Sequence, residues 1–275
     1  MAIVRRCKLC AVLILLLLLM QACAVRPSDV SHPDLPVRQQ TEAVNSLALF
    51  PAVRQIATLP DHLAVGSIPD RAIWQHHTFP GKKPSQYNYA FLDGRHAVMA
   101  SASSSASMLR HAVRVEPELL QDIAFSWKVR QLIPGADLTR RETHDSPVRL
   151  VLAFEGDRSE FSMKNAMLSE LSLTLTGEAM PYATLMYVWC NACTKETLFV
   201  NPRTDRIREI VLEAGPELIG HWLDYQRDVR ADYLKAFGEA PGALVGVGIM
   251  TDTDNTHQSA VAWYGPISLT THSIK

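Results

Sequence analysis

Apolar and polar residues alternate along most of the chain beyond residue 86, and a period of two is typical of strands with one buried face. Turn residues separate the runs, which are rich in β-branched and aromatic side chains. The pattern predicts strands at 87–100, 123–130, 146–156, 182–189, 196–202, 206–213, 243–250 and 260–269. Asp93-Gly94 divides the first run and predicts a hairpin turn, because glycine accepts a positive φ. The alternate serines of 101–107 are expected to share one strand face.

Two segments predict helices. Residues 159–170 have apolar side chains at helical spacing, whereas 171–177 alternate with period two and leave helix and strand both open. Residues 216–237 give the strongest helical pattern, with apolar or aromatic residues three or four positions apart. Pro216 suits the first turn of that helix and Gly238 suits its end.

The order of these elements indicates the fold class. Strands do not alternate regularly with helices, so a parallel doubly wound sheet is not expected. Many strands with two inserted helices predict a mainly β protein of the α+β class, an antiparallel β-sandwich with a jelly-roll-like topology. Residues 46–275 have a suitable length for a single domain of this kind.

The first residues have the pattern of an export signal. Three basic residues within positions 5–8 precede an uncharged apolar run at 9–20. This run is shorter than the roughly 20 residues that a membrane-spanning helix needs. We therefore expect residues 1–22 to be a signal peptide, with an uncleaved anchor and simple secretion as the alternatives.

The junction Met20-Gln21-Ala22-Cys23 resembles the lipobox of bacterial lipoproteins, in which the cysteine is lipidated and becomes the mature N-terminus. The resemblance implies that a lipid on Cys23 is the membrane anchor. Residues 23–45 are polar and rich in proline, which predicts a flexible tether. In lipoproteins an aspartate after the cysteine favours the inner membrane, so Ala24 implies the outer membrane, facing the periplasm.

The charge of the chain changes when the signal is removed. Residues 1–22 hold three basic residues and no acid, which leaves 24 basic and 28 acidic residues and a net charge of −4. A mildly acidic chain lacks the excess of positive charge that binding to nucleic acid needs. We therefore expect no nucleic-acid partner.

Two cysteines, Cys190 and Cys193, lie in the expected domain. In thioredoxin-like sites such a pair opens a helix, whose N-terminus lowers the thiol pKa. Residues 196–202 have strand character instead. We expect a local disulfide formed in an oxidising compartment, with redox chemistry or half of a metal site as alternatives.

The segment before the last predicted strand concentrates side-chain oxygens. Asp252, Asp254 and Asn255 are hard oxygen donors, which suit calcium better than a transition metal. The spacing is not that of an EF-hand, because Trp263 stands at the twelfth position. An ordinary polar turn is the alternative, since Asp and Asn accept hydrogen bonds from their own backbone. The sequence thus indicates no required cofactor, and weak Ca²⁺ binding at Asp252 and Asp254 is a hypothesis.

Aromatic residues on predicted strands offer a candidate ligand-binding site. Trp263 and Tyr264 follow the polar loop, and with Asn255 they are expected to contact a polar ligand, because sugar faces stack on aromatic rings. Trp127 and Trp189 are further candidates. Packing in the core is the alternative for each of these aromatic side chains.

Three function classes follow from these observations. The first is a non-catalytic binding module of the cell envelope, for glycan or another polar ligand. The second is a glycoside hydrolase, which needs two carboxylates about 5–10 Å apart across a cleft. Asp145 and Glu239 are candidates for such a pair, beside Asp252 and Asp254. The third is a structural lipoprotein that holds an envelope protein. The sequence lacks the common serine-hydrolase and zinc-protease motifs, so we favour the binding module and assign no catalytic residue.

Four strings in order along the chain resemble the bacterial family DUF3047: DSPVRLVLAFEGD, PYATLMYVW, FGEAPGALVGVGIMTDTDNT and AVAWYGPISL. The resemblance extends from residue 70 to the end of the chain. It implies a bacterial, often exported protein and no particular activity. The Cys190/Cys193 pair lies outside the resembling strings.

Overall fold

The computed structural model describes residues 46–48 and 74–271, which belong to one compact unit. The export signal and the lipidation site predicted within residues 1–23 lie outside the described residues. Within the described ranges, the helices are too short or too polar to cross a bilayer.

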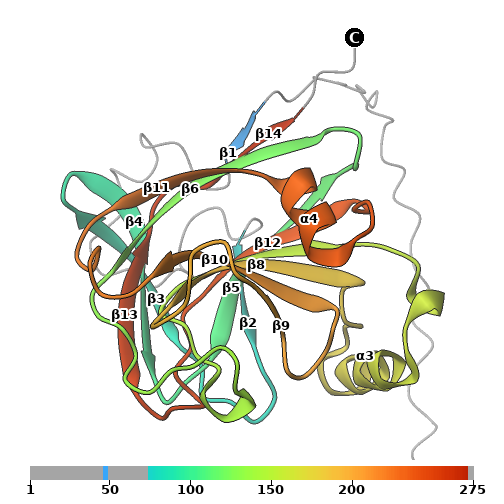
Figure 1. The fold of residues 1–275 in the computed structure, drawn as a ribbon, viewed down its shortest axis with the longest axis horizontal. Helices are drawn as coiled ribbons and strands as arrows, with labels where there is room; N and C mark the ends of the chain where they lie inside the picture. The colour runs from blue at the N-terminus through green and yellow to red at the C-terminus, as the bar shows by residue number, and fades with distance from the viewer. Residues whose placement is uncertain (1–45, 49–73, 272–275) are drawn as a thin grey trace, which may run out of the picture. The chain divides into compact units, whose positions relative to one another are not determined.

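The described strands form two seven-stranded sheets in a jelly-roll-like sandwich (Figure 1). Sheet A has the order β1–β14–β6–β13–β4–β3, and β11 pairs with β6 as well. Its strands are β1 (Ser46–Ala48), β3 (Gln86–Leu92), β4 (Arg95–Ser103), β6 (Leu120–Val129), β11 (Leu223–Asp228), β13 (Ser259–Tyr264) and β14 (Ser268–Thr271).

Sheet B has the order β2–β5–β12–β7–β8–β10–β9. Its strands are β2 (Trp74–Thr78), β5 (Ser107–Val115), β7 (Arg149–Phe154), β8 (Ala183–Cys190), β9 (Leu198–Val200), β10 (Ile207–Ala214) and β12 (Leu244–Met250). The described pairs are antiparallel except β8 with β10, which run parallel. The mainly β, antiparallel sandwich predicted from the sequence is therefore confirmed.

The core lies between the inward faces of the two sheets. Phe125 of sheet A stacks on Tyr187 of sheet B with their ring centroids 5.7 Å apart. Trp127 and Trp189 are fully buried in the same core. Neither tryptophan can present its ring to a ligand, so their candidacy for a binding site was wrong.

The structure has two α-helices among the described residues, α3 (Met163–Thr176) and α4 (Val229–Phe237), and two 3₁₀ turns, η2 (Arg141–Thr143) and η3 (Arg158–Glu160). Helix α3 begins at Ser162, whose side chain accepts a hydrogen bond from the Asn165 N–H, and ends at Gly177 in the left-handed conformation. In the segment that was ambiguous in the sequence, residues 171–176 thus continue the helix and Gly177 ends it.

The long helix predicted over 216–237 was wrong in its first half. Residues Leu223–Asp228 form β11, which pairs with β6 over six residues. Alternate side chains of β11, from Leu223 onwards, are part-buried, and those between them are exposed. Only after Asp228, whose carboxylate caps the Ala231 N–H, does the chain become helical. The helical spacing of apolar residues was thus compatible with a strand followed by a shorter helix.

A predicted turn and a predicted strand face had different outcomes. Asp93 and Gly94 both have positive φ values, 52° and 76°, as a two-residue hairpin turn between β3 and β4 requires. The serines of 101–107 do not line one strand face, because Ser104 has a φ of 46° and separates β4 from β5. The segment predicted as one strand at 260–269 is likewise divided into β13 and β14.

Candidate functional site

Trp263 and Tyr264 lie in the middle of sheet A, on β13 between β4 and β6. Consecutive strand residues point to opposite faces of a sheet. Tyr264 points into the core, where its hydroxyl donates to the Met250 carbonyl oxygen at 2.5 Å. Its ring is 2% exposed, so a ligand cannot stack on it, and its prediction as a binding residue is corrected here.

Trp263 points outward, away from the core. It stands in register with Met99 of β4 on one side and with Lys128 of β6 on the other. Asn88 of β3 pairs with Met99 and extends the row by one strand. Trp263 is partly exposed, and within the described residues its ring has no aromatic or cation–π partner. Its indole is therefore partly accessible to solvent in the centre of sheet A.

A second tryptophan, Trp222, lies on the same outer face. Its neighbour Leu223 pairs with Trp127 of β6, and the Gly220 N–H donates to the Val129 carbonyl oxygen at 2.9 Å. This register places Trp222 beside Lys128, across from Trp263. The two tryptophans are thus separated by two strand spacings, about 10 Å.

Gly265 and Ser126 let the Trp222 ring lie against sheet A. A Cβ atom at Gly265 would be 2.0 Å from the Ser126 Oγ and 3.6 Å from the Trp222 ring. Gly265 is two residues after Trp263 and therefore on the same face. The Arg95 guanidinium lies 5.3 Å from the centre of the Trp222 ring. A small residue at position 265 thus keeps this part of the face flat.

Charged side chains surround the two tryptophans. We define the Trp263 face as Asn88, Met99, Lys128, Trp222 and Trp263. Lys128 Nζ is 2.5 Å from an Asp93 carboxylate oxygen, and Arg95 forms two hydrogen bonds with Asp224, at 2.6 and 3.1 Å. The face thus combines an open indole with ammonium, guanidinium, carboxylate and amide groups at its rim.

The polar loop 251–258 connects β12 of sheet B with β13 of sheet A, and Asp145 holds it in place. One Asp145 oxygen accepts from the Asn255 side-chain amide at 2.8 Å. The other accepts from the N–H and the hydroxyl of Thr256, both at 2.7 Å. Asn255 is therefore engaged inside the loop, and its remaining amide oxygen accepts from Arg203 at 3.1 Å. The structure does not bring Asn255 to the Trp263 face.

Asp252 belongs to a buried charge network centred on Arg149. The Arg149 Nε donates to Asp252 at 2.8 Å, and its Nη1 donates to Glu209 at 3.0 Å. Burial raises the pKa of Asp252 to about 6, although Arg149 opposes that shift. Burial lowers the pKa of Arg149, but the two carboxylates outweigh burial and the net shift is upward. One buried cation thus holds two buried anions, as burial of charge requires.

His144 completes this network. Its Nε2 lies 3.2 Å from a Glu209 oxygen, and its carbonyl oxygen accepts from Arg149 Nη2 at 3.0 Å. Burial, assisted by the charge of Arg149, lowers the pKa of His144 to about 4. The imidazole is therefore neutral at physiological pH.

Three carboxylates converge beside the network, those of Asp145, Asp252 and Asp254. One oxygen from each lies within 4.8 Å of the others. Lys82 forms an ion pair with Asp254, while Arg149 holds Asp252. Hard oxygen donors suit calcium, but three carboxylates supply only part of its usual coordination, and two of them already have a protein cation. The calcium hypothesis thus remains a prediction, in which a metal ion must compete with Lys82.

The remaining carboxylate proposed for hydrolysis, Glu239, lies elsewhere. Its oxygens accept from Arg206 at 2.9 Å and from the Tyr182 hydroxyl at 3.4 Å. Arg206 in turn stacks on the Tyr182 ring, 3.8 Å from its centre. The candidate carboxylates are therefore all engaged by partners within the protein, and the structure does not bring Glu239 to the aspartate cluster.

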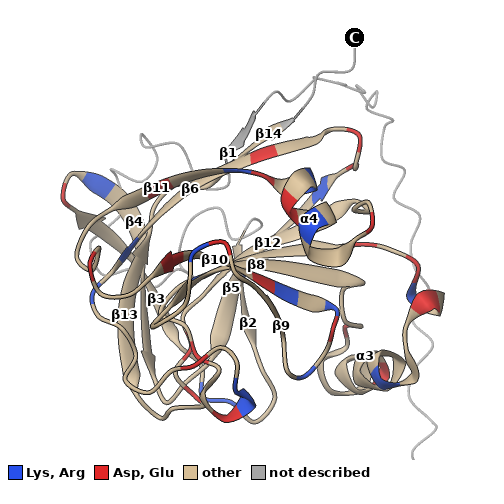
Figure 2. Cartoon of the chain, viewed as in Figure 1, with Lys and Arg blue, Asp and Glu red and all other residues tan. Residues whose placement is uncertain are grey.

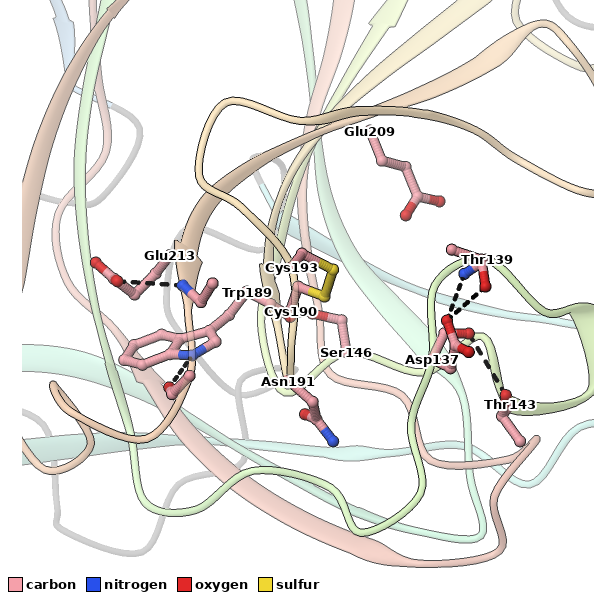
Figure 3. Close-up of a disulfide and its surroundings, with 12 residues drawn as sticks. Asp137, Thr139, Thr143, Ser146, Trp189, Cys190, Asn191, Cys193, Glu209 and Glu213 are labelled. Atoms are coloured by element: carbon pink, nitrogen blue, oxygen red, sulfur yellow. Dashed lines mark hydrogen bonds between the residues drawn. A yellow bond between two sulfur atoms is a disulfide. The ribbon is translucent and has the colours of Figure 1, made fainter.

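Cys190 and Cys193 form a disulfide at the end of β8 (Figure 3). Their Cα atoms are 5.7 Å apart, a usual separation for a bridged pair. Cys190 packs with Val188 and Val211 in a small apolar cluster on the outer face of sheet B. Figure 3 shows Ser146 and Trp189 beside the pair, and the Ser146 hydroxyl donates to the Trp189 carbonyl oxygen at 2.9 Å. The predicted local disulfide is therefore present.

Sequence reasoning missed Arg149, Glu209, Lys82 and Trp222. Arg149 and Glu209 are single charges inside otherwise apolar strands, β7 and β10, and this signal was available. Trp222 was assigned to the predicted long helix, which concealed its place on sheet A.

A family model described as "Protein of unknown function (DUF3047)" matches residues 72–268. The chain belongs to the DUF3047 family. No curated protein matches the DUF3047 chain.

Several solved structures resemble the DUF3047 chain at low identity. A xyloglucanase domain of NopAA, a type three effector from Sinorhizobium fredii, has 9% identity and a TM-score of 0.40, and the match covers 74% of this chain and 96% of that one. Endoglucanase cel12A from Rhodothermus marinus has 9% identity, a TM-score of 0.40 and coverages of 73% and 92%. A xylan-binding module, CBM86, from Roseburia intestinalis has 11% identity, a TM-score of 0.26 and coverages of 73% and 96%.

Proposed function

We propose that this protein is a non-catalytic binding module of the bacterial cell envelope, and that it binds glycan on the Trp263 face. The observation that best supports this proposal is the position of Trp263. It is partly exposed in the centre of sheet A, in one row with Lys128 and Met99. The C–H groups of a sugar ring pack on an indole face, and its hydroxyls bond to polar groups around it.

The carboxylates support binding rather than hydrolysis. A glycosidase needs one carboxylic acid and one carboxylate on opposite sides of a bound sugar. Asp252 and Glu209 are both buried and share Arg149. Asp93 and Asp224, beside the Trp263 face, each form an ion pair with a basic side chain. Each of these carboxylates is thus engaged by a basic side chain of the protein, and we favour binding over hydrolysis on this ground.

The envelope location rests on the N-terminal sequence and the disulfide. We propose lipidation at Cys23, with the domain in the periplasm at the outer membrane. The Cys190–Cys193 disulfide fits an oxidising compartment. Mass spectrometry of the mature N-terminus checks the lipid, because a retained Met1–Cys10 peptide would exclude cleavage before Cys23.

A screen on the mature chain tests the proposed function. The chain with Cys23→Ser is incubated with soluble glycans and cell-wall fragments, and both retention and the release of reducing ends are measured. We expect retention of a subset of glycans without release. Release of reducing ends would support the hydrolase alternative, and retention of none would favour an envelope scaffold that holds a protein.

A further inference from the structure

Helix α3 has its polar side against the protein and its apolar side in solvent. Asn165 and Ser169 face inward and are buried. Asn165 donates to Asp205 at 2.7 Å and accepts from the Thr204 hydroxyl at 2.7 Å. A surface helix normally buries its apolar stripe instead. Polar contacts therefore hold this helix and leave its apolar side chains for another partner.

The exposed side of α3 carries a continuous apolar stripe. Residues four apart on a helix are neighbours on one face. The side chains of Met163, Met167, Leu171 and Leu175 are spaced in this way, and they are 82%, 66%, 54% and 59% exposed. Leu173 is exposed as well. Figure 2 shows most of α3 in tan, because Lys164 and Glu170 are its two charged residues. Leu173 lies on another side of the helix, so we define the α3 stripe as Met163, Met167, Leu171 and Leu175.

The size of the stripe argues against a second copy of the chain as its partner. Fourteen residues make a helix about 21 Å long. A stripe about 10 Å wide, the diameter of a helix, then offers about 200 Å². A stable protein interface buries about 800 Å² on each partner. A dimer formed through this stripe alone would be too small to persist.

Contact with a lipid bilayer does not need so large an area, because the proposed lipid anchor already holds the protein at the membrane surface. The lipid on Cys23 supplies the attachment, so the second contact only has to orient the domain. The 22 residues between Cys23 and Ser46 can extend to about 75 Å. This exceeds the diameter of a domain of 200 residues, about 40 Å. If residues 23–45 form the flexible tether that the sequence predicts, their length does not restrict which side of the domain reaches the membrane.

We propose that the α3 stripe inserts into the lipid surface to which Cys23 is attached, and so orients the domain on the membrane. The proposal rests on the lipid anchor of the proposed function and not on glycan binding. The Trp263 face belongs to sheet A, whereas α3 connects β7 and β8 of sheet B. Both contacts can therefore be tested separately. Lys164 is the basic residue of the helix, and its long side chain can extend toward lipid headgroups.

A thiol-specific fluorophore tests the insertion. With the signal removed, Cys23 lipidated and the other two cysteines in a disulfide, a cysteine introduced by Met167→Cys is the single free thiol. The full lipidated chain is placed in vesicles of phosphatidylethanolamine and phosphatidylglycerol, with and without a lipid-borne quencher. Leu234→Cys is the matched control, because Leu234 is also exposed, at 55%, on the other helix.

We expect lipid-borne quencher to reduce the Met167 label emission at least twofold and to leave the Leu234 label unchanged. Equal quenching at both positions would mean that the anchor alone brings the domain near the lipid, and would overturn the proposal. No quenching at either position would overturn it as well. In the absence of lipid, the Met167 label could become less accessible to solvent as the protein concentration rises. That result would show that the partner is a second copy of the chain, and it would overturn the proposal. Glycan retention by Met167→Cys in solution reports on the proposed function independently.

Discussion

Trp263 and Tyr264 are neighbours in sequence, yet their side chains lie on opposite faces of sheet A. Tyr264 closes the core, where its hydroxyl also lies 3.0 Å from the Thr251 hydroxyl. Trp263 faces solvent between Met99 and Lys128. The polar loop before them is linked to the core side, through Asp252 and Arg149. The loop and the tryptophan are therefore two separate features, one linked to the core and one partly exposed on the outer face of sheet A.

Replacement of Arg149 is expected to destabilise the fold severely. In Arg149→Met, Asp252 and Glu209 lose their shared cation in the core. Leaving buried charges unpaired costs about 3–5 kcal/mol in the free energy of unfolding. Urea unfolding followed by fluorescence measures the loss.

An exposed pair and a charge-neutral triple variant are the controls. Arg95→Ala removes the exposed Arg95–Asp224 pair and should cost at most about 1 kcal/mol. Adding Asp252→Asn and Glu209→Gln to Arg149→Met should recover part of the lost stability. If Arg149→Met were as stable as Arg95→Ala, the charge network around Arg149 would not stabilise the fold.

Lys82 is expected to control any response to calcium. The Lys82 ammonium pairs with Asp254, beside Asp145 and Asp252. In Lys82→Met three carboxylates lose one cation, so the melting temperature should fall and added calcium should restore part of it. The wild type should respond less, because calcium must displace Lys82. Differential scanning fluorimetry with calcium or chelator gives both values.

Lys83→Met is a matched control for the charge change. Lys83 is the adjacent residue, and its ammonium donates to a backbone carbonyl oxygen rather than to a carboxylate. If calcium failed to stabilise Lys82→Met beyond Lys83→Met, the three carboxylates would be no cation site.

Acidification should affect His144 and Asp252 in opposite directions. The pKa of His144 is lowered from 6.5 to about 4, so the unfolded chain takes up its proton first and stability falls as the pH drops from 6.5 to 4. The pKa of Asp252 is raised from 3.8 to about 6, so the folded chain takes up its proton first and stability rises as the pH drops from 6 to 4.

Single variants separate these two contributions. Between pH 6.5 and 4.5, His144→Asn should lose less stability on acidification than the wild type, and Asp252→Asn should lose more. In each case the loss of stability between the two pH values should differ from that of the wild type by about 2 kcal/mol. This figure follows from the pKa shift of the group that the variant removes. Urea unfolding at the two pH values measures it. Equal slopes in all three proteins would show that neither group titrates in this range.

Removal of the disulfide should lower the stability of the domain and leave its binding unchanged. Cys190 and Cys193 are three positions apart, so the bridge closes a very small loop and contributes about 2 kcal/mol. The double variant Cys190→Ser/Cys193→Ser should melt at a lower temperature and retain its glycans unchanged. A loss of function at unchanged folding would favour redox chemistry at this pair instead.

The sequence predicted the parts of the fold that depend on local chemistry. The turn at Asp93-Gly94 follows from positive φ, and the sandwich follows from strands with period two. The pattern at 216–237 did not distinguish helix from strand, because Leu223 and Tyr225 also fit a period of two. Only the pairing of β11 with β6, about 100 positions earlier in the chain, decides this segment. Contacts over such distances in sequence are not encoded in a local pattern.

The candidate site was predicted in part. Trp263 was identified by its type and its strand, but pairing it with Tyr264 was an error that the period of a strand already excludes. The partner of Asp252 is Arg149 in another strand, so a loop of aspartates resembled an open cation site when it was read alone. Trp222 reaches the same face through β11, whose existence depends on tertiary contacts.

The binding affinity of Trp263 variants tests the central claim most directly. For a glycan retained in the screen, Kd is measured by calorimetry with the wild type, Trp263→Ala, Trp263→Phe and Phe91→Ala, whose exposed ring lies at the end of β3. Truncation of a central aromatic residue commonly costs 1–2 kcal/mol or more, about tenfold in Kd. We predict at least this loss for Trp263→Ala, a smaller loss for Trp263→Phe and an unchanged Kd for Phe91→Ala, with all four proteins equally stable. An unchanged Kd in a folded Trp263→Ala would contradict the account.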